Sequence, residues 1–487
     1  MITIEEDMDN ASITSNFFWR FAERILAQLV TLVVSVILAR ILIPEDYGVV
    51  ALVTVFISIM QIFIDSGLGT ALVQKKDADD IDFSSVFFFN IFISVTLYCL
   101  LFAASPLIAF FYSNYELVPL IRVSGIILLI AGIKNVQQAY VSRNMLFKNF
   151  FYSTLGGTIF SAVVGIVLAL FGFGAWALVA QMVSNYLIDT IILWIVVKWR
   201  PIKAFSPVRL KILISFGWKL LVSYTLDSVY NNLRSLIIGK IYTSSDLAFY
   251  NQAYQYPNTI VSNIDTSIDS VLLPVMSKAQ DDKDRVKTLT RRSIQISVYI
   301  MAPLMIGLAS ISEPLIKFLL TDKWLPAVPY LNIFCISFMF YPIHTANLNA
   351  ITAMGRSDLF LKMEIAKKTI GIILLCITAP ISVLAMAYSL LVSALTSQII
   401  NTWPNKKLLN YPYIEQLKDI FPEILLAVLM GFCVYWIKYL PIHLALVLTI
   451  QVVMGAIIYL GCSALFKMES YKYIVGVLKR YRNNLFK

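Results

Sequence analysis

Apolar runs of about 20 residues recur along almost the whole chain, and no other feature limits its fold as strongly. A helix rises about 1.5 Å per residue, so about 20 apolar residues are needed to cross the hydrocarbon core of a bilayer. The chain has 487 residues, of which 59% are hydrophobic and 14% are charged, whereas soluble domains are about a quarter charged. The sequence therefore predicts an all-α, polytopic membrane protein.

Counting these runs predicts about 14 transmembrane helices. The seventh and eighth runs contain more polar residues than an ordinary membrane span. The expected helices lie near residues 17–43, 48–73, 84–111, 117–140, 151–172, 174–198, 212–241, 246–275, 293–320, 327–353, 364–381, 383–402, 420–440 and 442–466.

Basic residues are distributed unevenly between the connections on the two sides of the expected membrane. If the N-terminus is cytoplasmic, 30 of the 39 Lys and Arg residues fall on cytoplasmic segments, and the positive-inside rule then predicts that both termini are cytoplasmic. Membrane topology also accounts for the net charge of +10, so we expect no nucleic-acid partner. The acidic start, MITIEEDMDN, lacks the basic region of a cleavable signal, so we expect the first helix to be retained.

The five cysteines show no metal-binding or disulfide pattern. All of them lie in apolar runs, and neither a CxxC motif nor a Cys/His spacing typical of zinc occurs in the sequence. We therefore expect no metal and no cofactor.

Two segments that begin at Trp19 and Trp218 share a pattern. After one inserted residue, Asp46 of the first segment corresponds to Asp246 of the second, and six expected helices separate the two. An even number of helices gives both segments the same orientation, which predicts two parallel six-helix lobes with a substrate site between them. The predicted boundaries are 1–13 for a cytoplasmic tail, 14–200 for the first lobe, 201–211 for a cytoplasmic linker, 212–402 for the second lobe, 403–466 for helices thirteen and fourteen, and 467–487 for a basic cytoplasmic tail.

Polar residues recur every three or four positions along the first two helices of each lobe, so each set forms one stripe. Charged groups in hydrocarbon are costly, at roughly 2.5–3.5 kcal/mol for a central charge, and this cost is avoided if the stripes face a hydrated cavity. Lys134, in the fourth helix, extends this cavity in our interpretation. The predicted substrate-binding residues are Arg20, Glu23, Arg24, Gln28, Asp65, Lys134, Lys219, Asp227, Asn231, Arg234, Asn258, Asp265 and Asp269.

A structural interpretation of the same residues competes with the functional one. Arg20 and Lys219 lie near cytoplasmic helix ends, from which long basic side chains can extend to the membrane surface. Polar stripes can also join helices to one another. His344, in the tenth helix, is a candidate for ion coupling because histidine titrates near neutrality, although a histidine bonded between helices would look the same in the sequence.

Two stretches resemble those of a known family. Residues 39–77, ARILIPEDYGVVALVTVFISIMQIFIDSGLGTALVQKKD, are similar to the first hairpin of Wzx-type polysaccharide-transporter flippases, which belong to the MOP exporter superfamily. Residues 249–282, FYNQAYQYPNTIVSNIDTSIDSVLLPVMSKAQDD, resemble the eighth-helix region of the same proteins. The similarity in helix count and loop order extends over nearly the whole chain.

This resemblance implies two six-helix lobes that form a V around a cationic cavity, with the last two helices added to them. It implies a flippase of the bacterial cytoplasmic membrane that moves an oligosaccharide on polyprenyl pyrophosphate by alternating access, for surface polysaccharide such as lipopolysaccharide, capsule or exopolysaccharide. The implied partners are this lipid-linked oligosaccharide, membrane lipids and other polysaccharide assembly proteins. Arg20 and Arg24 occupy places comparable to cavity arginines of related lipid flippases, and arginine binds phosphate oxygens in pairs.

Three other functions remain open from the sequence. A MATE-like drug exporter would use an acidic cavity, to which Asp65, Asp227, Asp265 and Asp269 could contribute. A membrane-embedded polysaccharide polymerase or ligase is less consistent with the short outer connections, so we expect no enzyme activity. A scaffold protein would have little use for so many charges inside its spans.

Overall fold

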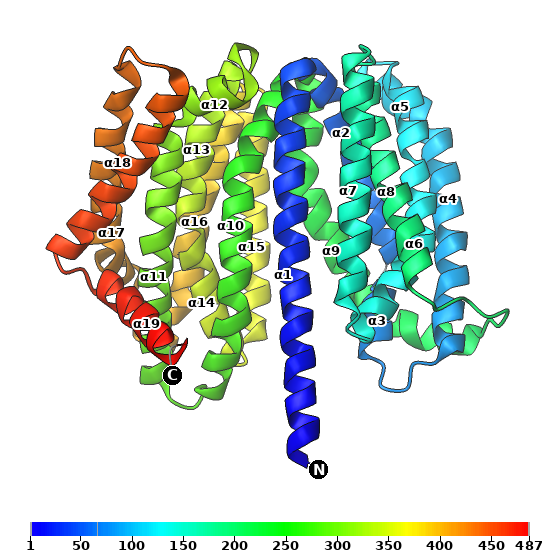
Figure 1. Ribbon diagram of the computed structural model, residues 1–487, viewed down its shortest axis with the longest axis horizontal. Helices are drawn as coiled ribbons and strands as arrows, with labels where there is room; N and C mark the ends of the chain where they lie inside the picture. Colours follow the sequence, from blue (N-terminus) through cyan, green and yellow to red (C-terminus); the bar gives the residue numbers. More distant parts are fainter. Residues whose placement is uncertain (1, 66, 486–487) are drawn as a thin grey trace. The chain divides into compact units, whose positions relative to one another are not determined.

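The computed structural model describes residues 2–65 and 67–485, and all the regular structure within them is helical. This confirms the predicted all-α class. Figure 1 shows the helices, which are α1 (Ile2–Ile41), α2 (Pro44–Asp65), α3 (Leu68–Gln74), α4 (Asp80–Tyr112), α5 (Leu117–Ser124), α6 (Ile126–Arg143), α7 (Phe147–Leu170), α8 (Ala175–Val196), α9 (Pro207–Ile241), α10 (Ser244–Lys278), α11 (Lys283–Ser310), α12 (Ser312–Leu320), α13 (Val328–Met339), α14 (Tyr341–Ala353), α15 (Ser357–Thr378), α16 (Val383–Leu408), α17 (Tyr413–Trp436), α18 (Leu444–Leu465) and α19 (Glu469–Leu485), with 3₁₀ turns at Asp322–Ala327 and Ile437–Tyr439.

Eleven helical segments of the described chain are long and apolar enough to cross a membrane, and α9, which bends by 49° between Ser215 and Gly217, would be a twelfth. Helices α10 and α15 have 35 and 22 residues, so they are long enough to span a membrane. Their sequences are more polar than those of the eleven segments, and they are not counted among them. The chain is therefore a multi-pass membrane protein, and the count of fourteen spans stays a prediction.

Four of the expected continuous helices are each divided into two. The break between α2 and α3 precedes Gly67, whose φ of 66° is a left-handed conformation that few other residues adopt. Gly125 separates α5 from α6, and Ile311 separates α11 from α12. Phe340 lies between α13 and α14, and Pro342 is in the first turn of the second of these helices, where proline needs no backbone donor.

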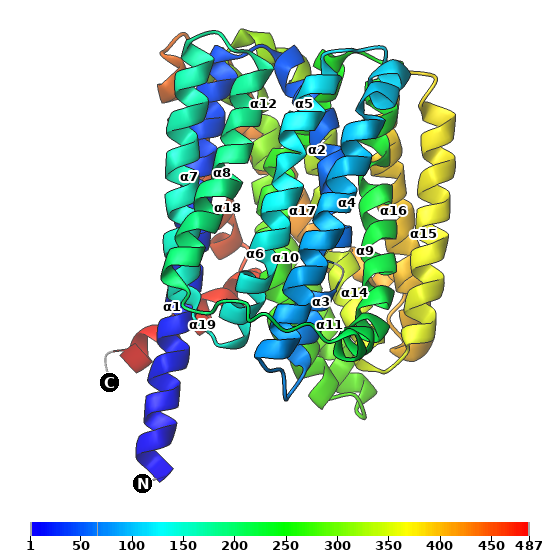
Figure 2. The ribbon, with the colours of Figure 1, turned by 90° about the vertical axis from the view of Figure 1, so that its right-hand side faces the viewer.

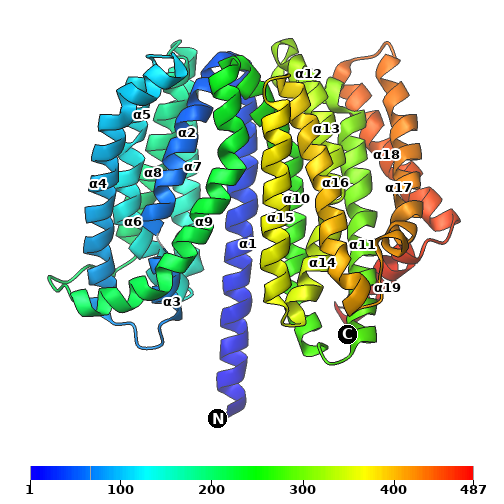
Figure 3. The ribbon, with the colours of Figure 1, turned by 180° about the vertical axis from the view of Figure 1, so that it is seen from behind.

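The chain forms two compact units, Met1–Ala248 and Phe249–Lys487. In the first unit, α7 packs on α1 and α8, α4 packs on α6, and α9 packs on α2, α3 and α4 (Figure 2). In the second unit, α11 packs on α13, α14 and α17, while α16 packs on α13, α14 and α15 (Figure 3). The sequence repeat predicts two lobes that superpose on each other. The two compact units are defined by contacts and do not test this, so the lobes stay a prediction.

The turn between the first two helices has the same geometry in both halves of the proposed repeat. Two residues lie between α1 and α2, and two residues lie between α9 and α10. In the first turn, the backbone N–H of Ile43 donates to Asp46 Oδ2 at 3.2 Å, and in the second the N–H of Thr243 donates to Asp246 Oδ2, also at 3.2 Å. The Asp46/Asp246 correspondence read from the sequence therefore marks equivalent helix starts.

Aromatic side chains fill the end of the first unit where α3, α4 and α6 meet the segment after α8. The ring of Trp199 stacks on Tyr140 at a centroid distance of 5.9 Å and lies 5.7 Å from that of Phe83. The segment then crosses the start of α4, where Ser84 Oγ accepts from the N–H of Ile202 at 2.9 Å. The expected linker, residues 201–211, is thus held against α4.

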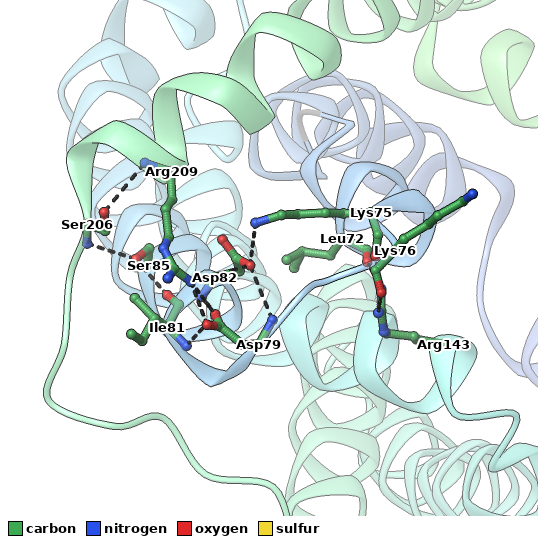
Figure 4. A network of polar contacts seen from close by, with 10 residues as sticks. All are labelled: Leu72, Lys75, Lys76, Asp79, Ile81, Asp82, Ser85, Arg143, Ser206 and Arg209. Atoms are coloured by element: carbon green, nitrogen blue, oxygen red, sulfur yellow. Dashed lines mark hydrogen bonds and ion pairs between the residues drawn. The ribbon is translucent and has the colours of Figure 1, made fainter.

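The acidic stretch 75–82 ends in a cap for helix α4 (Figure 4). The Asp79 side chain accepts from the first backbone N–H groups of α4, and Asp82 is fully buried beneath it. Both carboxylate oxygens of Asp79 accept from Arg209 Nη1 at 2.6 Å, which holds the pKa of Asp79 at about 2. Lys75 lies 2.5 Å from Asp82. Helix capping and these two bases keep the acidic side chains in place.

Candidate functional site

A cavity of about 550 Å³ lies within the first unit. It is lined by the end of α2, by α3, and by one face each of α4, α6 and α9. Gly67 lies on its wall because α9 passes very close: a Cβ on Gly67 would approach the carbonyl oxygen of Gly217 to 2.9 Å. The break between α2 and α3 therefore brings α9 against the cavity.

Polar groups from four helices, α2, α3, α4 and α6, line this cavity. Asp65, which we predicted as a site residue, accepts a hydrogen bond from the amide nitrogen of Asn135 on α6. Thr70 and Gln138 add a hydroxyl and an amide. Asn90, on α4, is only 3% exposed, and its Oδ1 has no hydrogen-bond partner among the described residues. The sequence did not single out Asn90, because one asparagine in an apolar helix forms no stripe.

Lys134 is placed next to this cavity but points away from it. Its Nζ lies 2.5 Å from Asp189 Oδ2 on α8, and both residues are more than nine-tenths buried. Lys134 is therefore half of an internal ion pair, and its charge is already neutralised. Asp189 was missing from the predicted residues, although a lone carboxylate inside a span is a signal that sequence reasoning could have used.

The stripe of α1 divides into a buried and an exposed part. Glu23 is buried, whereas Arg24 and Gln28 are exposed, and the substrate-binding role predicted for this stripe stays a prediction. Helix α7 packs on α1. The side chain of Arg20 lies outside the described residues.

The stripe of α9 also contains two environments. Lys219 and Asn231 are exposed, and Asp227 is half-buried. Arg234 is only 8% exposed, and its Nε and Nη2 have no hydrogen-bond partner within the part of the chain that the structure describes. A buried guanidinium is costly unless its donors are satisfied, so Arg234 is suited to an anion from outside the chain.

In the second unit, the structure links α10 to α14. Asp269 is exposed at one edge and accepts from Asn349 Nδ2 at 2.6 Å. Asn258 and Asp265 are half-buried on the same helix. His344, the candidate for ion coupling, has its Nδ1 against the side-chain amide of Asn401 on α16. This contact between helices is the alternative that we left open for His344, and its role in ion coupling stays a prediction.

The described side chains contain no group of three or more His, Cys, Asp or Glu residues that could hold a metal ion. The cavity is lined by a carboxylate and amides, and α1 and α9 carry guanidinium groups.

The sequence of this chain is similar to those of known biosynthesis proteins. A family model described as "Polysaccharide biosynthesis protein" matches residues 37–329, more than half of the chain. The teichuronic acid biosynthesis protein TuaB of Bacillus subtilis (strain 168) is 29% identical over 412 residues, which cover 82% of this chain and 84% of TuaB.

Two solved structures show the same fold. The lipid II flippase MurJ, in an inward closed conformation, matches with a TM-score of 0.73 at 14% identity, over 96% of this chain and 99% of MurJ. A multidrug resistance MATE family transporter of the MOP superfamily, facing inward, matches with a TM-score of 0.61 at 14% identity, over 80% of this chain and 98% of the transporter. The predicted MOP fold is confirmed, and the fold by itself does not separate lipid from drug transport.

Proposed function

Because the chain belongs to the polysaccharide biosynthesis protein family, we propose that it is a flippase for an oligosaccharide linked to polyprenyl pyrophosphate. It moves this lipid from the inner to the outer leaflet of the bacterial cytoplasmic membrane, where surface polysaccharide is assembled. Both termini lie in the cytoplasm, as the positive-inside rule predicts. Other assembly proteins receive the product, and the chain itself makes or breaks no covalent bond.

The observation that carries this proposal is the state of Arg234. Its guanidinium is buried with two nitrogens unsatisfied among the described residues, which is an unfavourable arrangement in the absence of an anion. A pyrophosphate offers several oxygens that accept hydrogen bonds, and arginine can bind two of them at once. The pyrophosphate of the substrate therefore supplies the hydrogen-bond acceptors that Nε and Nη2 of Arg234 lack among the described residues.

Arg24 provides a second positive charge of a different kind. It is exposed on α1, in a helix that is long and apolar enough to span the membrane. An exposed charge in a spanning helix needs water or a ligand beside it. We assign Arg24 to the first capture of the phosphate, and Arg234 to its binding in a drier environment.

Alternating access requires that these contacts change strength between the two states of the protein. A ligand that bound both states equally would shift no equilibrium. The outward-open state must therefore weaken the contact of at least one arginine with the phosphate. A drug exporter with the same fold would instead need to attract cations, and the two arginines oppose this.

Surface polysaccharide in a deletion strain, complemented with single variants at matched protein levels, tests the proposal. Arg24→Ala and Arg234→Gln should both abolish export, while Arg24→Lys should restore it only in part because lysine lacks the paired donors of arginine. The control is Arg292→Ala, which removes an exposed arginine of α11. Full export by both Arg24→Ala and Arg234→Gln would show that neither arginine binds substrate.

Arg234→Gln has a second readout that a structural role would not give. If the buried charge of Arg234 is unpaired until an anion binds, it destabilises the ligand-free protein. Removing that charge should then raise the thermal unfolding temperature of the ligand-free protein. If Arg234 holds the fold together, the same variant should unfold at a lower temperature.

A further inference from the structure

The cavity of the first unit has no basic residue among its described lining side chains, and its single charged residue is Asp65. Lys134 directly precedes Asn135, which lies on the cavity wall. Its Nζ lies 2.5 Å from Asp189 Oδ2, so it is already paired with a carboxylate. We propose that this cavity binds one uncharged sugar residue of the lipid-linked glycan, at a subsite separate from the arginines that bind its phosphate. This inference rests on the proposed function.

The groups on the wall match the hydroxyl groups of a sugar. Each hydroxyl both donates and accepts, so it pairs with a carboxylate, an amide or another hydroxyl. Asp65 supplies acceptors, while Thr70 and Gln138 supply both donors and acceptors. Asn135 holds the Asp65 carboxylate through its amide nitrogen, which fixes one acceptor before the ligand arrives.

Asn90 is an independent sign that a ligand belongs in the cavity. It is 97% buried, it lies on the wall, and its Oδ1 has no partner among the described residues. Buried amide oxygens are nearly always hydrogen-bonded, because an unsatisfied one costs about 1–3 kcal/mol. A sugar hydroxyl that donated to Asn90 Oδ1 would remove this cost.

The size and the remaining wall of the cavity fit the same ligand. A volume of about 550 Å³ lies within the range of about 300–1,000 Å³ that is typical of small-molecule sites. Tyr224, from α9, adds an aromatic ring, and Ile62 and Val86 add apolar surface. Sugars have C–H faces as well as hydroxyl edges, so an aromatic and aliphatic wall opposite polar groups suits them.

The charge of the cavity also decides what it excludes. The Asp65 carboxylate repels a phosphate or a sugar acid, since no described basic side chain of the lining offsets it. The pyrophosphate must therefore bind elsewhere, which agrees with the positions of Arg24 and Arg234 outside this lining. The cavity selects for the glycan, and the arginines select for the lipid phosphate.

Binding of two lipids by the purified full-length protein tests this assignment. One lipid is polyprenyl pyrophosphate without sugar, and the other is the lipid-linked glycan extracted from a strain that lacks the protein. Asn90→Leu removes the orphaned oxygen, and Thr70→Val removes a hydroxyl at an exposed position with almost no change of shape. The control is Asn332→Leu on α13, where a second asparagine with an unpartnered Oδ1 lies outside this cavity.

We expect wild-type protein to bind the glycan-bearing lipid more tightly than the sugarless one. Asn90→Leu should weaken binding of the glycan-bearing lipid about tenfold, and Thr70→Val about threefold, with binding of the sugarless lipid unchanged. Asn332→Leu should behave as wild type. The subsite is refuted if both cavity variants bind the glycan-bearing lipid normally, or if they lose both lipids equally. Failure of wild-type protein to bind either lipid would instead refute the proposed function.

Discussion

Two polar clusters, one in each compact unit, use different chemistry. In the first unit, the Lys134–Asp189 ion pair lies beside a cavity whose wall includes Asp65. Three ionisable groups are thus close to space that a ligand can occupy. Ionic groups bind and release charged or polar partners strongly, but they are costly to bury unless they are paired.

The cluster of the second unit is neutral and closed. Asn347 on α14 and Gln416 on α17 exchange two hydrogen bonds, at 2.9 and 3.0 Å, and Asn405 on α16 donates to Asn347 Oδ1 at 2.7 Å. All three side chains are almost completely buried. Such a cluster joins three helices without any charge that a substrate could compete for.

The comparison teaches that a polar residue inside a span is informative about function only together with its partners. Amides that bond to one another across three helices fix the positions of those helices, as in the second unit. Charges beside a cavity, or a buried arginine without a partner among the described residues, leave chemistry for a ligand, as in the first unit. Substitutions in the two clusters should therefore differ in both size and kind of effect.

The largest effect on stability is expected for Lys134→Met. This change leaves the buried Asp189 carboxylate without its base and should lower the free energy of unfolding by about 3–5 kcal/mol. Chemical denaturation in detergent micelles measures the loss. The double variant Lys134→Met/Asp189→Leu should recover most of it, because the pair is removed together. Additive losses in the double variant would mean that the two residues do not act as an ion pair.

A smaller effect is expected for Asn347→Leu in the neutral cluster. It removes the Oδ1 that accepts from both Asn405 and Gln416, which keep only longer bonds to backbone carbonyls, of 3.2 and 3.4 Å, and should cost about 1–3 kcal/mol in the same assay. Export per folded molecule should stay at the wild-type level, because no ligand contact is lost. A strong loss of export at nearly normal stability would place the substrate at this cluster and end the distinction between the two units.

The smallest effect is expected at the exposed ion pair between Asp79 and Arg209 (Figure 4). The pKa of Asp79 in the folded protein is about 2, below its ordinary 3.8, so the pair stabilises the fold above about pH 4 and loses this effect as the pH falls towards 2. Asp79→Asn can still cap α4 but cannot form the pair. Its thermal unfolding temperature should fall slightly at pH 7 and should match that of wild type at the acidic end. An equal difference at both pH values would show that capping, not charge, is at work.

The sequence predicted much of the fold because the membrane limits the choices so strongly. Length and hydropathy of the runs located nearly every helix, and Asp46 and Asp246 correctly indicated two equivalent turns. The helix breaks were missed because they depend on local geometry. At Gly67, for example, both the left-handed φ of 66° and the close approach of α9 explain why a residue without a side chain is required.

The candidate site was less accessible to sequence reasoning. Asp65 lies on the wall of a cavity and Lys134 is paired with Asp189, while the substrate-binding roles predicted for both stay predictions. Pairing between α6 and α8 is a property of three-dimensional packing, and periodicity along one helix does not contain it. Asn90 was missed for the same reason. It is of interest because its Oδ1 has no hydrogen-bond partner among the described residues, and a sequence pattern does not show this.

Reconstitution into liposomes tests the central claim most directly. The purified protein is incorporated together with the lipid-linked glycan, and a glycosidase that cannot cross the bilayer is added outside. The account predicts that the glycan of the inner leaflet becomes accessible to the enzyme with wild-type protein and stays protected with Arg234→Gln. Continued protection of the inner-leaflet glycan with wild-type protein, in liposomes where the protein is folded, would contradict the assignment of this chain as a flippase.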